Sequence, residues 1–188
     1  MNRFLCFFFF LFFFSASTGC RNVPFGRSAW LGTVSSSAIV LNVPFRAQVL
    51  PNLCGIASVE MVTAYYGLKL KEAQTVALLD EVQAKSGTSG MALKNALVQS
   101  DYFAAIFPGT VNSGEFSLLR FLQDKNPPIV MLGDGPRHYV VVTGYRPDKK
   151  QIILLDPAKG EITIAEENFF CSWKMANFFT LIMSPRLP

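Results

Sequence analysis

The chain has 188 residues, of which 51% are hydrophobic and 16% are charged, and its formal net charge is +4. This composition is too apolar for a disordered chain, and the length suits one domain or two small ones. The charges form no long basic run, which argues against nucleic-acid binding, and four dispersed cysteines with one histidine are too few for a disulfide scaffold or a zinc site. An enzyme and a binding domain remain the open classes.

Residues 1–19 have the pattern of a secretory signal peptide. Phe4 to Phe14 form an unbroken apolar run that follows Arg3 and precedes the small residues 15–19. Eleven helical residues span about half of the ~30 Å hydrocarbon core, too short for a transmembrane helix. A basic start, a short apolar centre and then small residues therefore predict a signal peptide that is removed on export.

The segment Ser17-Thr18-Gly19-Cys20 resembles a bacterial lipobox, with Ser17 where that motif usually has Leu. The resemblance implies that Cys20 is lipidated and becomes the first residue of the mature protein; cleavage nearby, with Cys20 a plain thiol, is the alternative. Residues 20–37, rich in Ser, Gly and other small residues, would then form a tether. The lipobox resemblance therefore implies a lipid-anchored protein of the bacterial cell envelope. In Gram-negative lipoproteins, a residue other than Asp after the cysteine is compatible with transport to the outer membrane. Arg21 stands at that position, so we expect the anchor in the outer membrane, facing the periplasm.

The first half of the remaining chain is predicted to hold one strand, 38–43, and four helices, 54–66, 71–84, 90–99 and 115–123. Apolar residues at helical spacing predict the first of these helices, which Gly67 stops. Ser89 supplies a hydroxyl that can cap the third helix.

After Pro127-Pro128 the pattern changes to short apolar runs typical of strands: 129–132, 139–145, 152–155, 161–164 and 178–183. Helices gathered in the N-terminal half and antiparallel strands in the C-terminal half indicate an α+β class, with the helices packed on the sheet. We expect one domain over residues 38–188.

Cys54 is a candidate nucleophile because it opens a predicted helix. Unpaired backbone N–H groups and the positive end of the helix dipole favour a thiolate there. The Cys54 N–H would remain free to bind an oxyanion, and Gly55 would let a substrate approach the backbone closely. Taken alone, a cysteine at this position is also typical of a small buried residue.

His138 and Asp156 are candidate partners of this thiol because a predicted hairpin brings them together. Its strands are joined at Arg146 to Lys150, a strong turn sequence. If His138 lies directly opposite Asp156, the midpoint of the hairpin is Pro147, inside this turn. A carboxylate in that place would orient the imidazole and stabilise its protonated form.

Gln48 lies six positions before Cys54, in the segment that leads into the helix. Its side-chain NH₂ could complete an oxyanion hole with the Cys54 N–H. Taken alone, Gln48 gives little information. His138 could equally be a histidine in the core or at the edge of the sheet, and Asp156 could be an ordinary turn residue. The interpretation therefore depends on the four residues fitting one another.

These residues stand in segments that resemble the peptidase C39 and C39-like family, from about Leu41 to Trp173: Asn42 to Phe45, Gln48, Leu53 to Ser58, Gly87 to Ser89, Pro128 to Val130, His138 to Val142 and Asp156 to Gly160. The resemblance implies a papain-like fold and a thiol peptidase that needs no metal or cofactor. It also implies that Cys54 is the nucleophile, His138 the general base and acid, Asp156 the group that orients the histidine, and Gln48 the oxyanion donor.

Members of this family often cleave secreted precursors after a Gly-Gly leader, as a domain fused to an export ATPase. This sequence has no Walker motif and no transporter helices, and it carries its own export signal. It therefore resembles the free-standing, envelope-located forms. The expected partners are a peptide or protein substrate, for which a Gly-Gly precursor is one candidate, and the membrane that holds the lipid anchor.

Three alternatives stay open from the sequence. The domain could bind or scaffold peptides without turnover, or act as a peptidoglycan amidase or transglutaminase-like acyl transferase, since those folds share the order of the triad. A Cys54–Cys171 disulfide is also conceivable in an oxidising envelope. We expect Cys171 instead to be a small buried residue with a free thiol.

Overall fold

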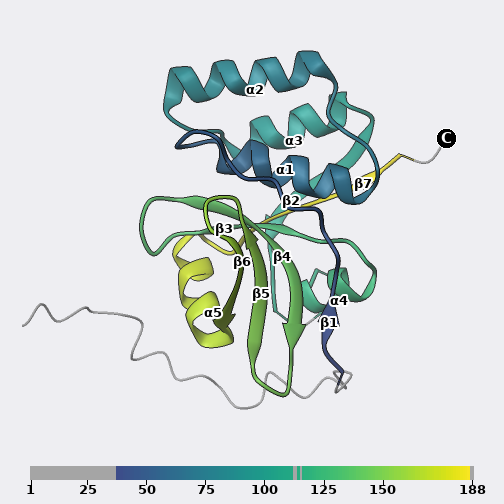
Figure 1. Ribbon diagram of the computed structural model, residues 1–188, viewed down its shortest axis with the longest axis vertical. Coiled ribbons are helices and arrows are strands. Elements are labelled where there is room, and N and C mark those ends of the chain that lie inside the picture. Colours follow the sequence, from purple (N-terminus) through teal and green to yellow (C-terminus); the bar gives the residue numbers. More distant parts are fainter. Residues whose placement is uncertain (1–36, 112–113, 115, 187–188) are drawn as a thin grey trace, which may run out of the picture.

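The computed structural model describes residues 37–111, 114 and 116–186 (Figure 1). The predicted signal peptide, Cys20 and nearly all of the tether lie outside the described residues. The elements are β1 Ile39–Val40, α1 Cys54–Tyr65, α2 Glu72–Lys85, α3 Gly90–Gln99, β2 Tyr102–Pro108, α4 Leu118–Gln123, β3 Ile129–Leu132, β4 His138–Arg146, β5 Gln151–Asp156, β6 Gly160–Ala165, α5 Glu166–Met175 and β7 Phe179–Pro185. Within these described ranges, no helix has the length and apolarity needed to cross a membrane.

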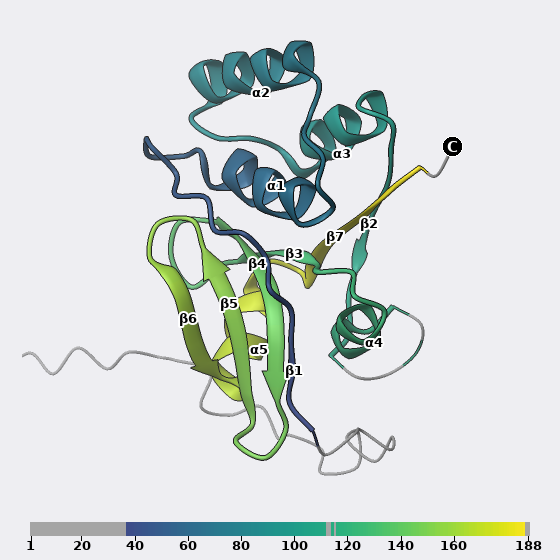
Figure 2. The ribbon, with the colours of Figure 1, turned by 45° about the vertical axis from the view of Figure 1, so that its right-hand side comes forward.

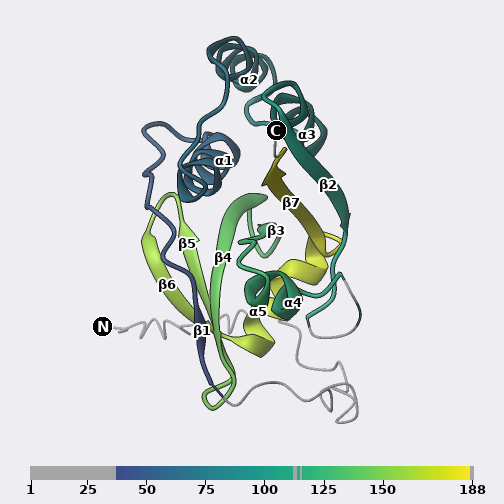
Figure 3. The same ribbon diagram turned by 90° about the vertical axis from the view of Figure 1, so that its right-hand side faces the viewer.

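The strands form one antiparallel sheet in the order β2-β7-β3-β4-β5-β6, and β1 pairs with β4 beside this path. Helices α1, α2 and α3 gather at one end of the molecule, whereas α4 and α5 lie beside the sheet towards the other end (Figures 2 and 3). The predicted α+β class, with helices packed on an antiparallel sheet, is confirmed.

Strand β4 runs through the middle of the molecule and separates two apolar cores. Tyr139 and Val141 pack with residues of α1 and α3 in one core, and Val140 and Val142 pack with residues of α4 and α5 in the other. Successive side chains of a strand point to opposite faces, so a strand that is covered on both faces must be apolar at nearly every position. This requirement explains the continuous run from 139 to 142 in the sequence.

Two elements differ from the sequence expectation because their patterns are weak. Strand β2 was not predicted, since two alanines interrupt the apolar alternation between Phe103 and Ile106. Helix α5 was also not predicted, although Phe169 and Trp173, both fully buried, stand four residues apart as a helix requires.

Three predicted elements differ from the structure by two or more residues at one end. Only Ile39–Val40 of the strand expected at 38–43 pairs in the sheet. The helix expected over 115–123 begins at Leu118, because the side chain of Ser117 accepts a hydrogen bond from the Arg120 N–H at 3.2 Å and caps the helix there. Strand β7 runs over Phe179–Pro185 rather than 178–183.

Helix α5 anchors the second core, so its aromatic side chains should dominate stability there. Phe169 is fully buried, and its ring centroid lies 5.4 Å from that of Trp173. We expect Phe169→Ala to lower the free energy of unfolding by about 3–5 kcal/mol, through lost burial and the cavity left behind. Phe103, which is 55% exposed on β2, supplies the control, and Phe103→Ala should cost less than about 1 kcal/mol. Equal losses for the two variants in urea unfolding would contradict this account of the core.

Candidate active site

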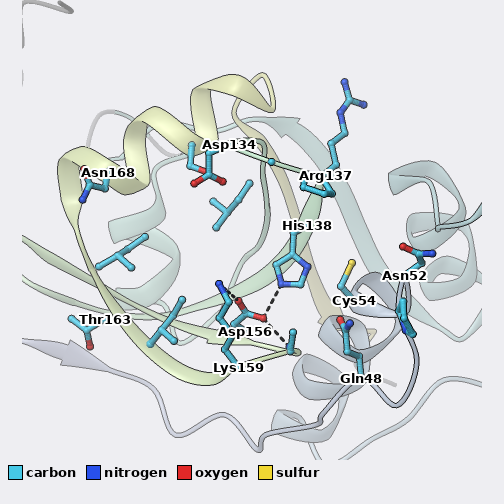
Figure 4. A pocket seen from close by; sticks show the side chains of 18 of the residues that line it. Gln48, Asn52, Cys54, Asp134, Arg137, His138, Asp156, Lys159, Thr163 and Asn168 are labelled. Atoms are coloured by element: carbon cyan, nitrogen blue, oxygen red, sulfur yellow. Dashed lines mark hydrogen bonds and ion pairs between the residues drawn. The ribbon is translucent and has the colours of Figure 1, made fainter. Parts of the chain in front are cut away.

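The four residues singled out in the sequence line one cavity of about 810 Å³ (Figure 4). They come from separate parts of the chain: Gln48 from the segment before α1, Cys54 from the first position of α1, His138 from the start of β4 and Asp156 from the end of β5. The fold therefore brings the expected residues to one place. The packing of α1 on β4 is the contact that joins the thiol to the imidazole.

Cys54 is a free cysteine, 8% exposed, at the N-terminus of α1. The preceding residue, Leu53, offers no side-chain acceptor to the first N–H groups of the helix. Burial alone would raise the pKa of the thiol. Four contributions act against burial: a hydrogen bond to His138, a hydrogen bond to the backbone of Tyr139, the positive charge of His138 and a hydrogen bond to the backbone of Gly55. Together they outweigh burial, so the pKa of Cys54 is lowered. The thiolate is therefore favoured over the thiol at this site.

His138 is held between Cys54 and Asp156. Its Nε2–H donates to Asp156 Oδ1 at 2.8 Å, and its other ring nitrogen faces Cys54 (Figure 4). The hydrogen bond with Cys54 raises the pKa of the imidazole, burial opposes this, and the hydrogen bond and charge of Asp156 add to the increase, so the pKa is raised overall. The lowered pKa of the thiol and the raised pKa of the imidazole both favour a thiolate–imidazolium pair.

Asp156 is fixed by the turn between β5 and β6. Its side chain is 3% exposed, and Oδ1 accepts a second hydrogen bond, from the Ala158 N–H, at 2.8 Å. The turn closes with the Lys159 N–H donating to the Asp156 carbonyl at 3.1 Å and with Gly160 at φ 86°, a conformation that favours glycine. The carboxylate is thus oriented before any substrate arrives.

The expected register of the β4–β5 hairpin is wrong, although the predicted contact exists. Arg146 pairs with Gln151, and a bulge between Val142 and Gly144 shifts the register so that Val141 pairs with Leu155. Continuing this register places Val140, not His138, opposite Asp156. His138 is the diagonal neighbour on the same face, and a diagonal separation of about 7–8 Å lies within reach of an aromatic side chain such as the imidazole. The error arose because a bulge leaves no mark in the spacing alone.

Gln48 is fixed by its backbone to the turn that follows Asp156. Its N–H donates to the carbonyl of Pro157 at 2.9 Å, and its side chain extends towards Cys54 (Figure 4). The side-chain oxygen, Oε1, is buried and lacks a hydrogen-bond partner among the described residues. The Gln48 side chain thus lies in the same part of the cavity as Cys54.

The role expected for Gly55 is wrong. A Cβ at this position would lie 3.1 Å from the side chains of both Leu93 and Tyr139. Gly55 therefore faces the core between α1, α3 and β4, and it permits close packing of the helix on the sheet rather than approach of a substrate.

The Cys54–Cys171 disulfide considered from the sequence is not formed. Cys54 is free, and Cys171 is half-buried in α5. Pairing depends on which cysteines lie close in space, and the spacing of four cysteines does not give that.

The end of β3 and the turn that leads to β4 also line the cavity, through Leu132, Asp134, Gly135 and Pro136. Residues of the turn after β5, of β6 and of α5 were missed: Ala158, Lys159, Ile162, Thr163, Ile164, Ala165, Asn168 and Ser172. No group of three or more His, Cys, Asp or Glu side chains suited to a metal ion occurs in the part of the chain that the structure describes.

A cysteine on a helix that packs against an antiparallel sheet carrying a histidine and a carboxylate defines the papain-like peptidase fold. The model of the Peptidase_C39 like family matches residues 40–180, and the chain belongs to this family. A comparison with curated proteins gave no match.

Solved structures share the fold at low identity. A double glycine motif protease from an AMS/PCAT transporter, in complex with the leader peptide, is 24% identical, covering 78% of this chain and 94% of its own, with a TM-score of 0.59. The peptidase domain of Streptococcus ComA, a bi-functional ABC transporter, is 22% identical, covering 75% and 97%, with a TM-score of 0.58. A Bacillus anthracis protein assigned to the C39-like peptidases is 17% identical, covering 81% and 100%, with a TM-score of 0.59.

His138→Ala tests the electrostatics of this site. The substitution removes the hydrogen bond and the charge that lower the Cys54 pKa and leaves burial, which raises it. Because each unit of pKa changes the thiolate fraction tenfold below the pKa, we expect alkylation of Cys54 by iodoacetamide near neutral pH to slow by at least about tenfold. The rate is measured by mass spectrometry of the Cys54 peptide. Asp148→Ala, at the exposed tip of the β4–β5 hairpin, should leave the rate unchanged, and an unchanged rate in His138→Ala would refute the coupling.

Proposed function

We propose that this chain is a cysteine peptidase that hydrolyses peptide bonds of a secreted or periplasmic protein or peptide. The observation that carries the proposal is a free thiol with a lowered pKa, at a helix N-terminus, in the same cavity as an imidazole held at 2.8 Å by a buried carboxylate. Membership of the C39-like family supports the same reaction class.

In the first half of the reaction, the Cys54 thiolate attacks the carbonyl carbon of the scissile bond. A bond forms between Sγ and this carbon, and the oxyanion accepts hydrogen bonds from the Cys54 N–H and the Gln48 side-chain NH₂. The C–N bond then breaks, and the His138 imidazolium gives its proton to the leaving nitrogen. The products are a thioester on Cys54 and a free amine.

In the second half, water cleaves the thioester. His138, now neutral, takes a proton from the water as the oxygen attacks the carbonyl carbon, and the same two donors stabilise the oxyanion. The S–C bond breaks, and the acid product leaves the thiolate–imidazolium pair restored. Asp156 keeps the imidazole in one orientation through both halves.

The solved AMS/PCAT protease was crystallised with a leader peptide, which supports a peptide as substrate here. A Gly-Gly precursor remains one candidate within that class. We further propose that the protein is exported and lipidated at Cys20, so that the peptidase domain acts beside a bacterial membrane and meets substrates in the envelope.

Peptide hydrolysis tests the reaction. With a mixed library of proteome-derived peptides, we expect cleavages by the wild type that disappear in Cys54→Ala. On a substrate found in this way, Gln48→Ala should lower kcat/KM by about 10²–10³ because one oxyanion donor is lost. The exposed substitution Asp148→Ala provides the matched control. Cleavage that persists in Cys54→Ala would eliminate the mechanism, and peptide binding by the wild type without turnover would favour the scaffold alternative.

Cell fractionation tests the anchor separately. We expect the full chain to sediment with membranes and to incorporate a labelled fatty acid, whereas Cys20→Ser should be exported without the label and be released from the membrane fraction. A label that persists in Cys20→Ser, or a wild type that incorporates none, would rule out the lipid at this residue.

A further inference from the structure

The cavity extends well beyond the catalytic residues. It continues between strand β6 and helix α5, where Ile162, Ile164, Asn168 and Ser172 line it. In Figure 4, Cys54 lies at one end of this space and Thr163 and Asn168 at the other, with His138 and Asp156 between them. A site that only cleaved the peptide bond would not need this extension, so the space is available for a further part of the substrate.

The proposed reaction defines which part of the substrate enters this space. The carbonyl oxygen must lie near Gln48 and the Cys54 N–H, while the leaving nitrogen must lie within reach of His138 to receive its proton. The chain that follows the scissile bond therefore leaves the reacting atoms on the imidazole side. That is the side on which the cavity runs past Asp156 between β6 and α5 (Figure 4).

Lys159 gives this part of the cavity a positive charge close to the reacting atoms. Its Nζ lies 3.9 Å from Asp156 Oδ2, and its side chain is 70% exposed. This distance is too long for a hydrogen bond, so the ammonium keeps its donors available. Figure 4 places the ammonium beside Asp156, on the side away from Cys54. Asp156 is buried and accepts hydrogen bonds from His138 and Ala158, so it presents little negative charge to a substrate.

Besides Asp156, the charged residues that line the cavity together with Lys159 are Asp134 and Arg137. Asp134 accepts a hydrogen bond from the Ser172 hydroxyl at 2.7 Å, which places its carboxylate at the α5 side of the cavity. The side chain of Arg137 points away from the cavity centre (Figure 4). The cation nearest to a peptide that passes His138 and Asp156 is thus Lys159.

We propose that the space between β6 and α5 binds the residues that follow the scissile bond, and that Lys159 selects an acidic side chain, Asp or Glu, among the first of them. This inference rests on the proposed peptidase activity and names a substrate class for it. Because the ammonium is largely exposed, its preference for a carboxylate over the matching amide should be modest, about three- to fivefold in kcat/KM.

The test compares paired synthetic peptides that carry Glu or Gln at each of the first three positions after a cleavage site identified with the wild type. The measured quantity is the ratio of kcat/KM for the Glu peptide to that for the Gln peptide. A change in the basicity of His138 affects both peptides equally, so the ratio isolates recognition from any effect of Lys159 on the catalytic residues.

We expect the ratio to be about three to five for the wild type at one of these positions, close to one for Lys159→Gln, and below one for Lys159→Glu. Lys149→Glu, an exposed charge reversal at the distant hairpin tip, should keep the wild-type ratio. A ratio near one in the wild type, or one that Lys159→Glu leaves unchanged, would overturn the inference while the peptidase activity stands. Absence of any Cys54-dependent cleavage would instead overturn the proposed function, and this inference with it.

Discussion

The hydrogen bond between His138 Nε2 and Asp156 Oδ1, 2.8 Å long, is the interaction on which the proposed chemistry depends. It determines which ring nitrogen is left to face Cys54, and it favours the charged imidazole that in turn favours the thiolate. Asp156 can do this because its turn orients it from behind through the Ala158 N–H. The β5–β6 turn, rather than the strand pairing itself, therefore sets the geometry of the site.

Tyr139, the residue after the histidine, joins the sheet to the helices that carry the thiol. Its backbone contributes to the lowered pKa of Cys54, and its ring lies against the position where Gly55 has no Cβ. Its hydroxyl donates to the Thr88 carbonyl at 3.3 Å, and its ring centroid lies 5.6 Å from that of Phe179. Because one buried side chain touches α1, the start of α3 and β7, the distance between thiol and imidazole is set by the core.

The sequence was sufficient to predict the α+β class, the helix that begins at Cys54 and the meeting of four distant residues, because each depends on local periodicity or on residue types that fit a common chemistry. It was not sufficient for the bulge between Val142 and Gly144 or for the inward-facing Gly55. These features depend on how separate segments pack. For the same reason the cavity wall formed by β6 and α5, with Lys159 beside it, became visible only in three dimensions.

His138 is the only histidine of the chain, so its imidazole can be followed by NMR without assignment ambiguity. The most direct measurement is a pH titration of the labelled histidine in the wild type, in Cys54→Ala and in Asp156→Asn. The account predicts a wild-type pKa above the ordinary value of about 6.5, and lower values in both variants, because each loses a partner that stabilises the charged ring. An unshifted pKa in the wild type, equal to that of both variants, would contradict the account.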